Sequence, residues 1–257
     1  MEYLSVSEAR DLPGLRLVLS TGVPGPWGEA AKGIFHVKGL HYAPVAQYGA
    51  MANEDLVAWT GHANAPIAVY DDEKPRTGWA EILFLAERLA PEPRLVPEDP
   101  AERALMFGLA HEICGENGLG WSRRLMLVGD LLKPESSEME KQIGATLGGR
   151  YGFSPEAAVA APGRVAGILR LLSQQLAKQK EAGCDFLVGA SLSALDIYWA
   201  TFAVLLAPLP KADCPIPGFL ARSYANTGPV VAAALDPALL AHRDRIYRSY
   251  LKLPMDF

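Results

Sequence analysis

The chain has 257 residues, of which half are hydrophobic and 21% are charged, and its formal net charge is -5 at pH 7. This length suits one large domain or two modest ones, and either arrangement can bury a core. The acidic balance argues against nucleic-acid binding, because proteins that hold the phosphate backbone usually present a basic face. The first residues lack the basic flank and the long apolar run of a secretory signal. We therefore expect a cytoplasmic protein.

The cysteines and histidines give no sign of a metal centre. The three cysteines are far apart, odd in number and outside CxxC spacing, which favours free thiols in a reducing compartment. The five histidines are scattered, and no two of them have metal-ligand spacing on one helix. The most apolar stretch, residues 195–210, is too short to cross a bilayer and indicates a buried helix. We expect neither a metal nor a membrane partner.

The first ninety residues alternate between strand and helix patterns. An apolar run at 15–19 predicts a buried strand. After a loop rich in glycine and proline, Pro26 favours the start of a helix and Gly39 favours its end. Residues 41–48 form a weaker strand candidate, and the proline within them places it at a sheet edge.

The pattern continues to residue 89. Residues 54–59 predict a short helix, residues 65–70 predict a strand that opens with proline, and residues 79–89 predict an amphipathic helix. Together these elements form a β-α-β unit, a strand pair and a closing helix. There are too few strands for a doubly wound sheet.

A stiff connector separates this part from a helical remainder. Residues 91–100 contain four prolines and three acids, as exposed linkers do. We expect an α/β domain at 1–90, this linker, and an all-α helical bundle at 101–257. The helices are predicted at 101–116, 121–132, 137–147, 161–182, 193–206, 217–226, 229–235 and 239–251.

One helix start in the second domain carries a specific signal. In the segment FLVGASLSALDIYWA, Ser193 precedes Asp196 by three residues at the head of an apolar helix. The hydroxyl can accept from a backbone N–H, and the acid can reach back to the cap. The pattern predicts a structural role for both residues.

Four segments together resemble the glutathione transferase superfamily. The segment around Ser193 looks like its core-helix motif, and WTGHANAPIAVYDD looks like its loop into a cis-proline strand. TGWAEILFLAERL and GPWGEAAKGIFHVKGL resemble the helices after that strand and before the second strand. The resemblance spans nearly the whole chain. It implies a thioredoxin-like first domain, an all-helical second domain, and usually a homodimer.

The resemblance also implies where glutathione binds. The residue before the cis-proline pairs with the cysteinyl backbone, which nominates Ala65 and Pro66. The γ-glutamyl carboxylate belongs at the start of the next helix, which nominates Thr77 and Gly78. Trp27 is nominated by position as a further glutathione-binding residue and as a candidate contact of the second substrate.

Two positions depart from the family pattern. A Ser, Cys or Tyr that steers the thiol is replaced by Gly25, and the carboxylate-binding hydroxyl is absent at Gly78. The amide of Gly25 is the expected catalytic replacement, with Ser20 and Thr21 just upstream. Backbone donors at a helix start can still hold an anion.

For a second, hydrophobic substrate, the resemblance nominates residues of the helical domain by position. Plain core packing is the competing interpretation for each of them, and His111 is a candidate core histidine. The nominated residues are Met106, His111, Cys114, Trp121 and Tyr198.

Two functions remain open from the sequence. The first is a glutathione-dependent transferase or lyase that acts on a small hydrophobic electrophile. The second is a non-catalytic binding or interaction module that kept the fold, which Gly25 and Gly78 motivate. A thiol reductase is disfavoured, because GPWG at the first helix has no cysteine for exchange.

Overall fold

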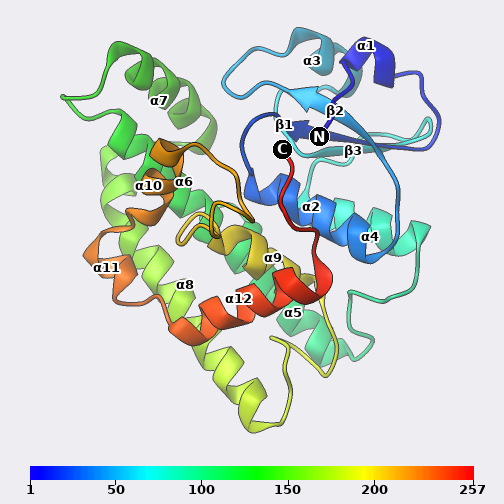
Figure 1. Cartoon of the computed structure of the whole chain (residues 1–257), viewed down its shortest axis with the longest axis vertical. Coiled ribbons are helices and arrows are strands. Elements are labelled where there is room, and N and C mark those ends of the chain that lie inside the picture. The colour runs from blue at the N-terminus through cyan, green and yellow to red at the C-terminus, as the bar shows by residue number, and fades with distance from the viewer. The chain divides into compact units, whose positions relative to one another are not determined.

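The computed structural model describes residues 1–257, which divide into two compact units (Figure 1). The first unit contains Met1–Leu95 together with two later segments, Pro210–Ile216 and Tyr247–Phe257. The second unit contains Val96–Leu209 and Pro217–Ile246.

Two C-terminal segments belong to the first unit and not to the helical domain in which they were expected. Residues 210–216 and 247–257 were expected in the helical bundle, but their contacts lie within the first unit. The backbone N–H of Met255 donates to the carbonyl of Asp213 at 2.7 Å. Lys32 Nζ lies 3.3 Å from a carboxylate oxygen of Asp256. These contacts tie the chain terminus to the α/β part.

The first unit is built on a three-stranded sheet in the order β2-β1-β3. The central strand β1 (Leu15–Ser20) runs parallel to β2 (Ala43–Gln47) and antiparallel to β3 (Ile67–Tyr70). The proline-containing strand lies at an edge, as predicted. The expected strand pair is reduced to β3 and one isolated bridge between Ala68 and Arg76.

Helices cover both faces of this sheet (Figure 1). Two of them, α2 (Pro26–Val37) and α4 (Trp79–Leu89), pack against each other on one face. The short helices α1 (Val6–Ala9) and α3 (Glu54–Thr60) lie on the other. The core between this second pair and the sheet consists of Ala9, Val18, Val45, Leu56, Ile67 and Val69. Since β1 is buried on both faces, its sequence is continuously apolar apart from Arg16 and Ser20.

A buried lysine fastens the end of α2 to the connector. Lys38 is the C-cap of helix α2, and Gly39 follows with φ +64°, the left-handed conformation that favours glycine. Lys38 Nζ lies 2.7 Å from Glu87 Oε1 and donates to the carbonyls of Ala90 and Pro93 at 2.8 and 2.9 Å. Its side chain has no exposed surface.

The second unit is all helical. Helix α6 packs with α7 and α8, α5 packs with α9, and α8 packs with α11. The last helix ends in residues that belong to the first unit. In order, the helices are α5 (Pro100–Cys114), α6 (Leu119–Leu131), α7 (Glu138–Tyr151), α8 (Pro155–Glu181), α9 (Ala194–Ala203), α10 (Gly218–Ala225), α11 (Gly228–Ala232) and α12 (Pro237–Tyr250).

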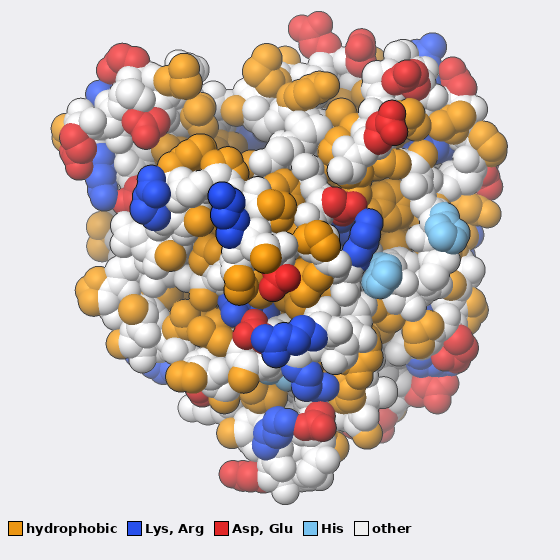
Figure 2. Space-filling view, in the orientation of Figure 1, with side chains coloured by type: hydrophobic (Ala, Val, Ile, Leu, Met, Phe, Trp, Pro, Cys, Tyr) orange, Lys and Arg blue, Asp and Glu red, His pale blue; other side chains and the backbone are white.

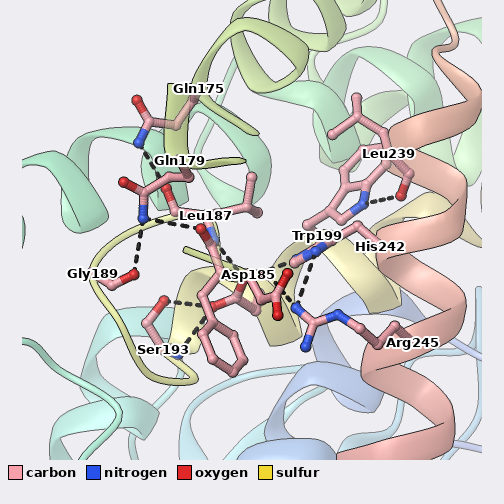
Figure 3. A network of polar contacts seen from close by, with 12 residues as sticks. Gln175, Gln179, Asp185, Leu187, Gly189, Ser193, Trp199, Leu239, His242 and Arg245 are labelled. Carbon is pink, nitrogen blue, oxygen red and sulfur yellow. Dashed lines mark hydrogen bonds and ion pairs between the residues drawn. The ribbon is translucent and has the colours of Figure 1, made fainter. Parts of the chain in front are cut away.

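Helix α9 is buried along its whole length. Polar contacts connect its N-terminal cap to the surrounding loops (Figure 3). One Asp196 oxygen accepts from the backbone N–H and the hydroxyl of Ser193 at 3.0 and 2.9 Å. The other accepts from the N–H of Leu187 and lies 2.9 Å from His242 Nε2. The two predicted capping residues therefore form a capping box that also joins α12 to the loop before α9.

No helix combines the length and the apolar character needed to cross a bilayer. No group of three or more His, Cys, Asp or Glu side chains is arranged to hold a metal ion.

Candidate ligand-binding site of the first unit

The nominated residues of the first unit gather where β1 ends and β3 begins. Register pairs Ser20 with Gln47 across the parallel ladder and Val18 with Ile67 across the antiparallel one. Pro66 and Ala65 therefore lie beside the last residues of β1. The candidate site is this edge of the sheet, formed by the C-terminal end of β1 and the N-terminal end of β3.

The peptide bond between Ala65 and Pro66 is cis, as the resemblance implied. The β3 ladder begins at Ile67, so Ala65 lies just outside it. Ala65 is partly buried against the core, whereas Pro66 is buried. The backbone of Ala65 is thus placed at the rim of the sheet, where an extended peptide could extend the ladder.

Gln47 fixes this edge from inside. The hydroxyl of Ser20 donates to Gln47 Oε1 at 2.7 Å. Gln47 Nε2 donates to the carbonyls of Tyr48 and Ala63, both at 3.1 Å. The side chain is only 2% exposed. One buried amide therefore connects the end of β1 to the loop that leads into the cis-proline.

The same residue engages Thr21. The N–H of Thr21 donates to the carbonyl of Gln47 at 3.0 Å, and its hydroxyl lies 3.4 Å from that oxygen. Ser20 and Thr21, which the sequence nominated as catalytic, therefore lie at the site with their hydroxyls turned to Gln47. Their contacts stabilise the edge of the sheet.

The start of α2 faces the same edge. The first i to i−4 hydrogen bond of this helix runs from Glu29 N–H to the Gly25 carbonyl, at 2.9 Å. Gly25 is the N-cap and has no side chain to cap the helix, and the half-buried Trp27 occupies the first turn. An added Cβ at Gly28 would lie 3.1 Å from the side chain of Leu19, so this glycine lets the helix approach β1 closely.

The amide of Gly25, the expected catalytic donor, has a partner within the chain. Its N–H donates to the carbonyl of Val23 at 2.9 Å, within the loop between β1 and α2. The reason is local: the chain turns tightly before Pro26, which itself has no N–H. The anion-attracting feature that remains here is the N-terminal end of the α2 dipole.

The start of α4 completes the edge. Ala68 and Arg76 exchange backbone hydrogen bonds of 2.9 and 2.8 Å. The next residues, Thr77 and Gly78, therefore run alongside the start of β3 toward Pro66. Gly78 is the N-cap of α4 and provides no side-chain cap.

The carboxylate of Glu81 is hydrogen-bonded to the backbone of these two residues. Glu81 Oε2 accepts from Thr77 N–H at 3.2 Å and from Gly78 N–H at 3.0 Å. Hydrogen bonding from Gly78 lowers the pKa of Glu81, with smaller contributions from Thr77 and from the charges of Lys74 and Arg76. Glu81 is therefore ionised at neutral pH and complements the helix dipole.

The residues nominated for a second substrate all belong to the second unit. Met106, Cys114 and Tyr198 are buried, and burial raises the pKa of both the Cys114 thiol and the Tyr198 hydroxyl. Trp121 Nε1 donates to the Tyr151 carbonyl at 3.0 Å, and the two rings meet edge-on with centroids 4.9 Å apart. Trp121 thus holds α6 against the end of α7.

His111 is exposed on α5 rather than in the core. Its ring lies over Gly115, the C-cap of the helix, where a Cβ would collide with it. The interpretation of this residue as a core histidine is therefore wrong.

Two residues of the site escaped the sequence analysis. Glu81 carries a signal, because a glutamate three residues after the cap position is the second half of a capping box. Gln47 carries none, because a glutamine at the end of an edge strand is ordinarily exposed.

Charges of both signs are mixed on the face shown in Figure 2, where acidic and basic side chains are interspersed among apolar ones.

The similarity of this chain to known proteins is detected in its structure and not in its sequence. No family model matches the sequence, and no curated protein sequence matches it. A glutathione S-transferase from Methylobacterium radiotolerans, in complex with glutathione sulfonate, is 18% identical with a TM-score of 0.60, over 92% of each chain. The rice enzyme OsGSTU1, in complex with glutathione, is 18% identical with a TM-score of 0.61, over 95% of this chain and 93% of that one.

A third similar structure is that of an enzyme with a different activity. The β-etherase LigF from Sphingobium sp. strain SYK-6 is 21% identical with a TM-score of 0.58, over 90% of this chain and 99% of that one. At these identities the comparisons establish a shared fold that extends over most of the chain.

Proposed function

We propose, from the premise that this chain has the glutathione transferase fold, that it binds glutathione and joins it through its sulfur to a small apolar electrophile. One observation supports the proposal above all. The end of β1, the start of α2, the cis Ala65–Pro66 bond and the start of α4 converge on a single edge of the first unit's sheet.

Each part of that edge suits a different part of the tripeptide. The cysteinyl backbone pairs with Ala65, just outside the β3 ladder. The thiol lies before the start of α2, beside Trp27. The γ-glutamyl carboxylate lies at Thr77 and Gly78, where the α4 dipole favours an anion.

Activation of the thiol rests on the helix and not on a side chain. The hydroxyls of Ser20 and Thr21 are turned to Gln47, and Gly25 N–H is engaged by Val23. A helix N-terminus lowers a thiol pKa and increases the thiolate fraction. The thiol proton passes to solvent, and the thiolate attacks the electrophilic carbon and forms the C–S bond. With a halide or an aryl ether the leaving group departs with the electron pair of the broken bond, and with an epoxide or an enone that pair moves to the oxygen, which takes up a proton.

For the electrophile, the candidates from the resemblance are Met106, His111, Cys114, Trp121 and Tyr198. Of these, exposed His111 is accessible for a polar contact as the chain stands. The proposal also includes a homodimer in the cytoplasm. Light scattering on the purified protein tests the dimer directly.

A second function has its own supporting observation. Because Gly25 and Gly78 have no side chains and the amide of Gly25 is engaged internally, the chain could bind a thiol peptide without activating it. A non-catalytic binding module is therefore the alternative.

Turnover separates the two functions. The purified protein is incubated with glutathione and a panel of aryl halides, epoxides, enones and aryl ethers, and thiol consumption is compared with the uncatalysed rate. The transferase proposal expects saturable acceleration with at least one class. Glutathione binding without acceleration for any of them would establish the alternative.

A further inference from the structure

The start of α4 already holds an anion that belongs to the chain. Glu81 Oε2 receives the N–H groups of Thr77 and Gly78, at 3.2 and 3.0 Å. They belong to the two residues at which the proposed function places the γ-glutamyl carboxylate, and they are the donors that the helix start offers to an anion there. One oxygen occupies both, so a second carboxylate cannot use them at the same time.

Glycine at position 78 is coupled to this arrangement. A Cβ added at Gly78 would lie 3.2 Å from Glu81 Oε2 and 3.4 Å from Glu81 Cγ. A side chain at position 78 would therefore press on the carboxylate and shift it. The observed position of the Glu81 carboxylate therefore depends on the absence of a side chain at position 78.

We propose that Glu81 is an internal competitor for the γ-glutamyl carboxylate, so that glutathione binds fully only after the Glu81 side chain turns into solvent. The inference rests on the proposed function. It adds to it a residue that sets the affinity for ligands with a carboxylate at this position.

The displacement is feasible because Glu81 is exposed and has room to turn away. Hydrogen bonds from the two amides keep its pKa low, with Lys74 and Arg76 as the charged neighbours. Two carboxylates at one pair of donors would repel each other. Competition with a cap of this kind weakens binding about fivefold, which corresponds to about 1 kcal/mol.

The experiment compares two ligands and three variants by isothermal titration calorimetry. Glutathione has the γ-glutamyl carboxylate, whereas N-acetylcysteinylglycine lacks it. Glu81→Ala removes the competitor, and Glu81→Gln keeps an acceptor without the charge. Glu8→Ala is the matched control, because Glu8 accepts from Ser5 N–H at 2.8 Å in the capping box of α1. Circular dichroism confirms that each variant is folded.

The expected result is selective. Glu81→Ala tightens glutathione binding about fivefold or more, Glu81→Gln tightens it less, and neither changes the affinity for N-acetylcysteinylglycine. Glu8→Ala changes neither affinity.

Three outcomes would overturn the inference. If the parent chain binds glutathione and the Glu81 variants bind it equally or more weakly, Glu81 is not a competitor. An equal gain for both ligands would show a general loosening of α4. If neither the parent nor any Glu81 variant binds glutathione, the proposed function fails and the inference fails with it.

Discussion

The hydroxyl of Ser20 donates to the side-chain oxygen of Gln47 at 2.7 Å, while the nitrogen of the same amide donates to the Ala63 carbonyl at 3.1 Å. These contacts join the end of the central strand to the loop before Pro66. The geometry of the candidate site therefore depends on a side chain that would not itself touch the ligand.

Replacement of Gln47 tests this relationship. Gln47→Leu leaves the Ser20 hydroxyl and the Ala63 carbonyl without their partners, and we expect the free energy of unfolding to fall by about 1–3 kcal/mol. Glutathione affinity should fall as well, because the loop before the cis-proline is released. Urea unfolding and calorimetry measure the two effects. The exposed Gln142→Leu on α7 is the control, and equal stability of the two variants would refute the role of Gln47.

Ser20 and Thr21 should prove structural. Ser20→Ala removes one hydrogen bond and should lower stability by about 1 kcal/mol. For any electrophile that the protein turns over, kcat/KM at saturating glutathione should stay within about threefold for Ser20→Ala and for Thr21→Val. A catalytic hydroxyl typically contributes about a hundredfold or more. A loss of that size in either variant would show that the hydroxyl takes part in the reaction.

Much of the first unit could be predicted because its elements depend on local signals. Helix α4 begins and ends at the residues expected from its periodicity, and α2 begins at the proline that favours a first turn. Helix α1 has four residues, too few for a periodic pattern. Helix α8 begins at Pro155 under a Ser154 cap, six residues before the predicted start at residue 161.

The buried Lys38 should be a major determinant of stability in the first unit. Lys38→Met leaves Glu87, whose side chain is 17% exposed, without its cationic partner and with only the Leu95 N–H as a donor. Loss of one member of a buried pair costs about 3–5 kcal/mol, which lowers the melting temperature by roughly 6–20 °C for a chain of this size.

The control for that variant is Lys141→Met, whose ion pair with Glu138 on α7 is exposed. Surface pairs contribute about 0–1 kcal/mol, so its melting temperature should change by at most a few degrees. Equal melting temperatures for the two variants would contradict the role assigned to Lys38.

The three thiols should differ in reactivity. Burial raises the pKa of Cys214 to about 11, and the charge of Glu29 adds to the effect. Burial also raises the pKa of Cys114, whereas Cys184 is partly exposed. Because the thiolate is the reactive form, iodoacetamide at pH 7.5 should label Cys184 first.

Peptide mass mapping of the folded protein checks this order, and urea-unfolded protein, in which all three thiols react, is the control. Labelling of Cys214 should accelerate as the pH rises toward its pKa. Rapid labelling of Cys114 or Cys214 at pH 7.5 in the folded chain would contradict the burial described.

The candidate site was only partly accessible from sequence, for a physical reason. Ala65, Pro66, Thr77 and Gly78 belong to segments with recognisable patterns, and the register brings them to one edge. The direction of a hydroxyl or an amide depends on a partner far along the chain. Ser20 finds Gln47 27 residues later, and no local pattern contains that pairing.

Thermal unfolding of the purified chain with increasing glutathione tests the central claim, that the first unit binds this tripeptide. N-acetylcysteinylglycine and equal salt are the controls. A ligand at a hundred times its dissociation constant stabilises the folded state by about 2.7 kcal/mol, so the midpoint should rise, saturably, by roughly 5–10 °C. An unchanged midpoint at millimolar glutathione, in the parent chain and in Glu81→Ala alike, would contradict the account.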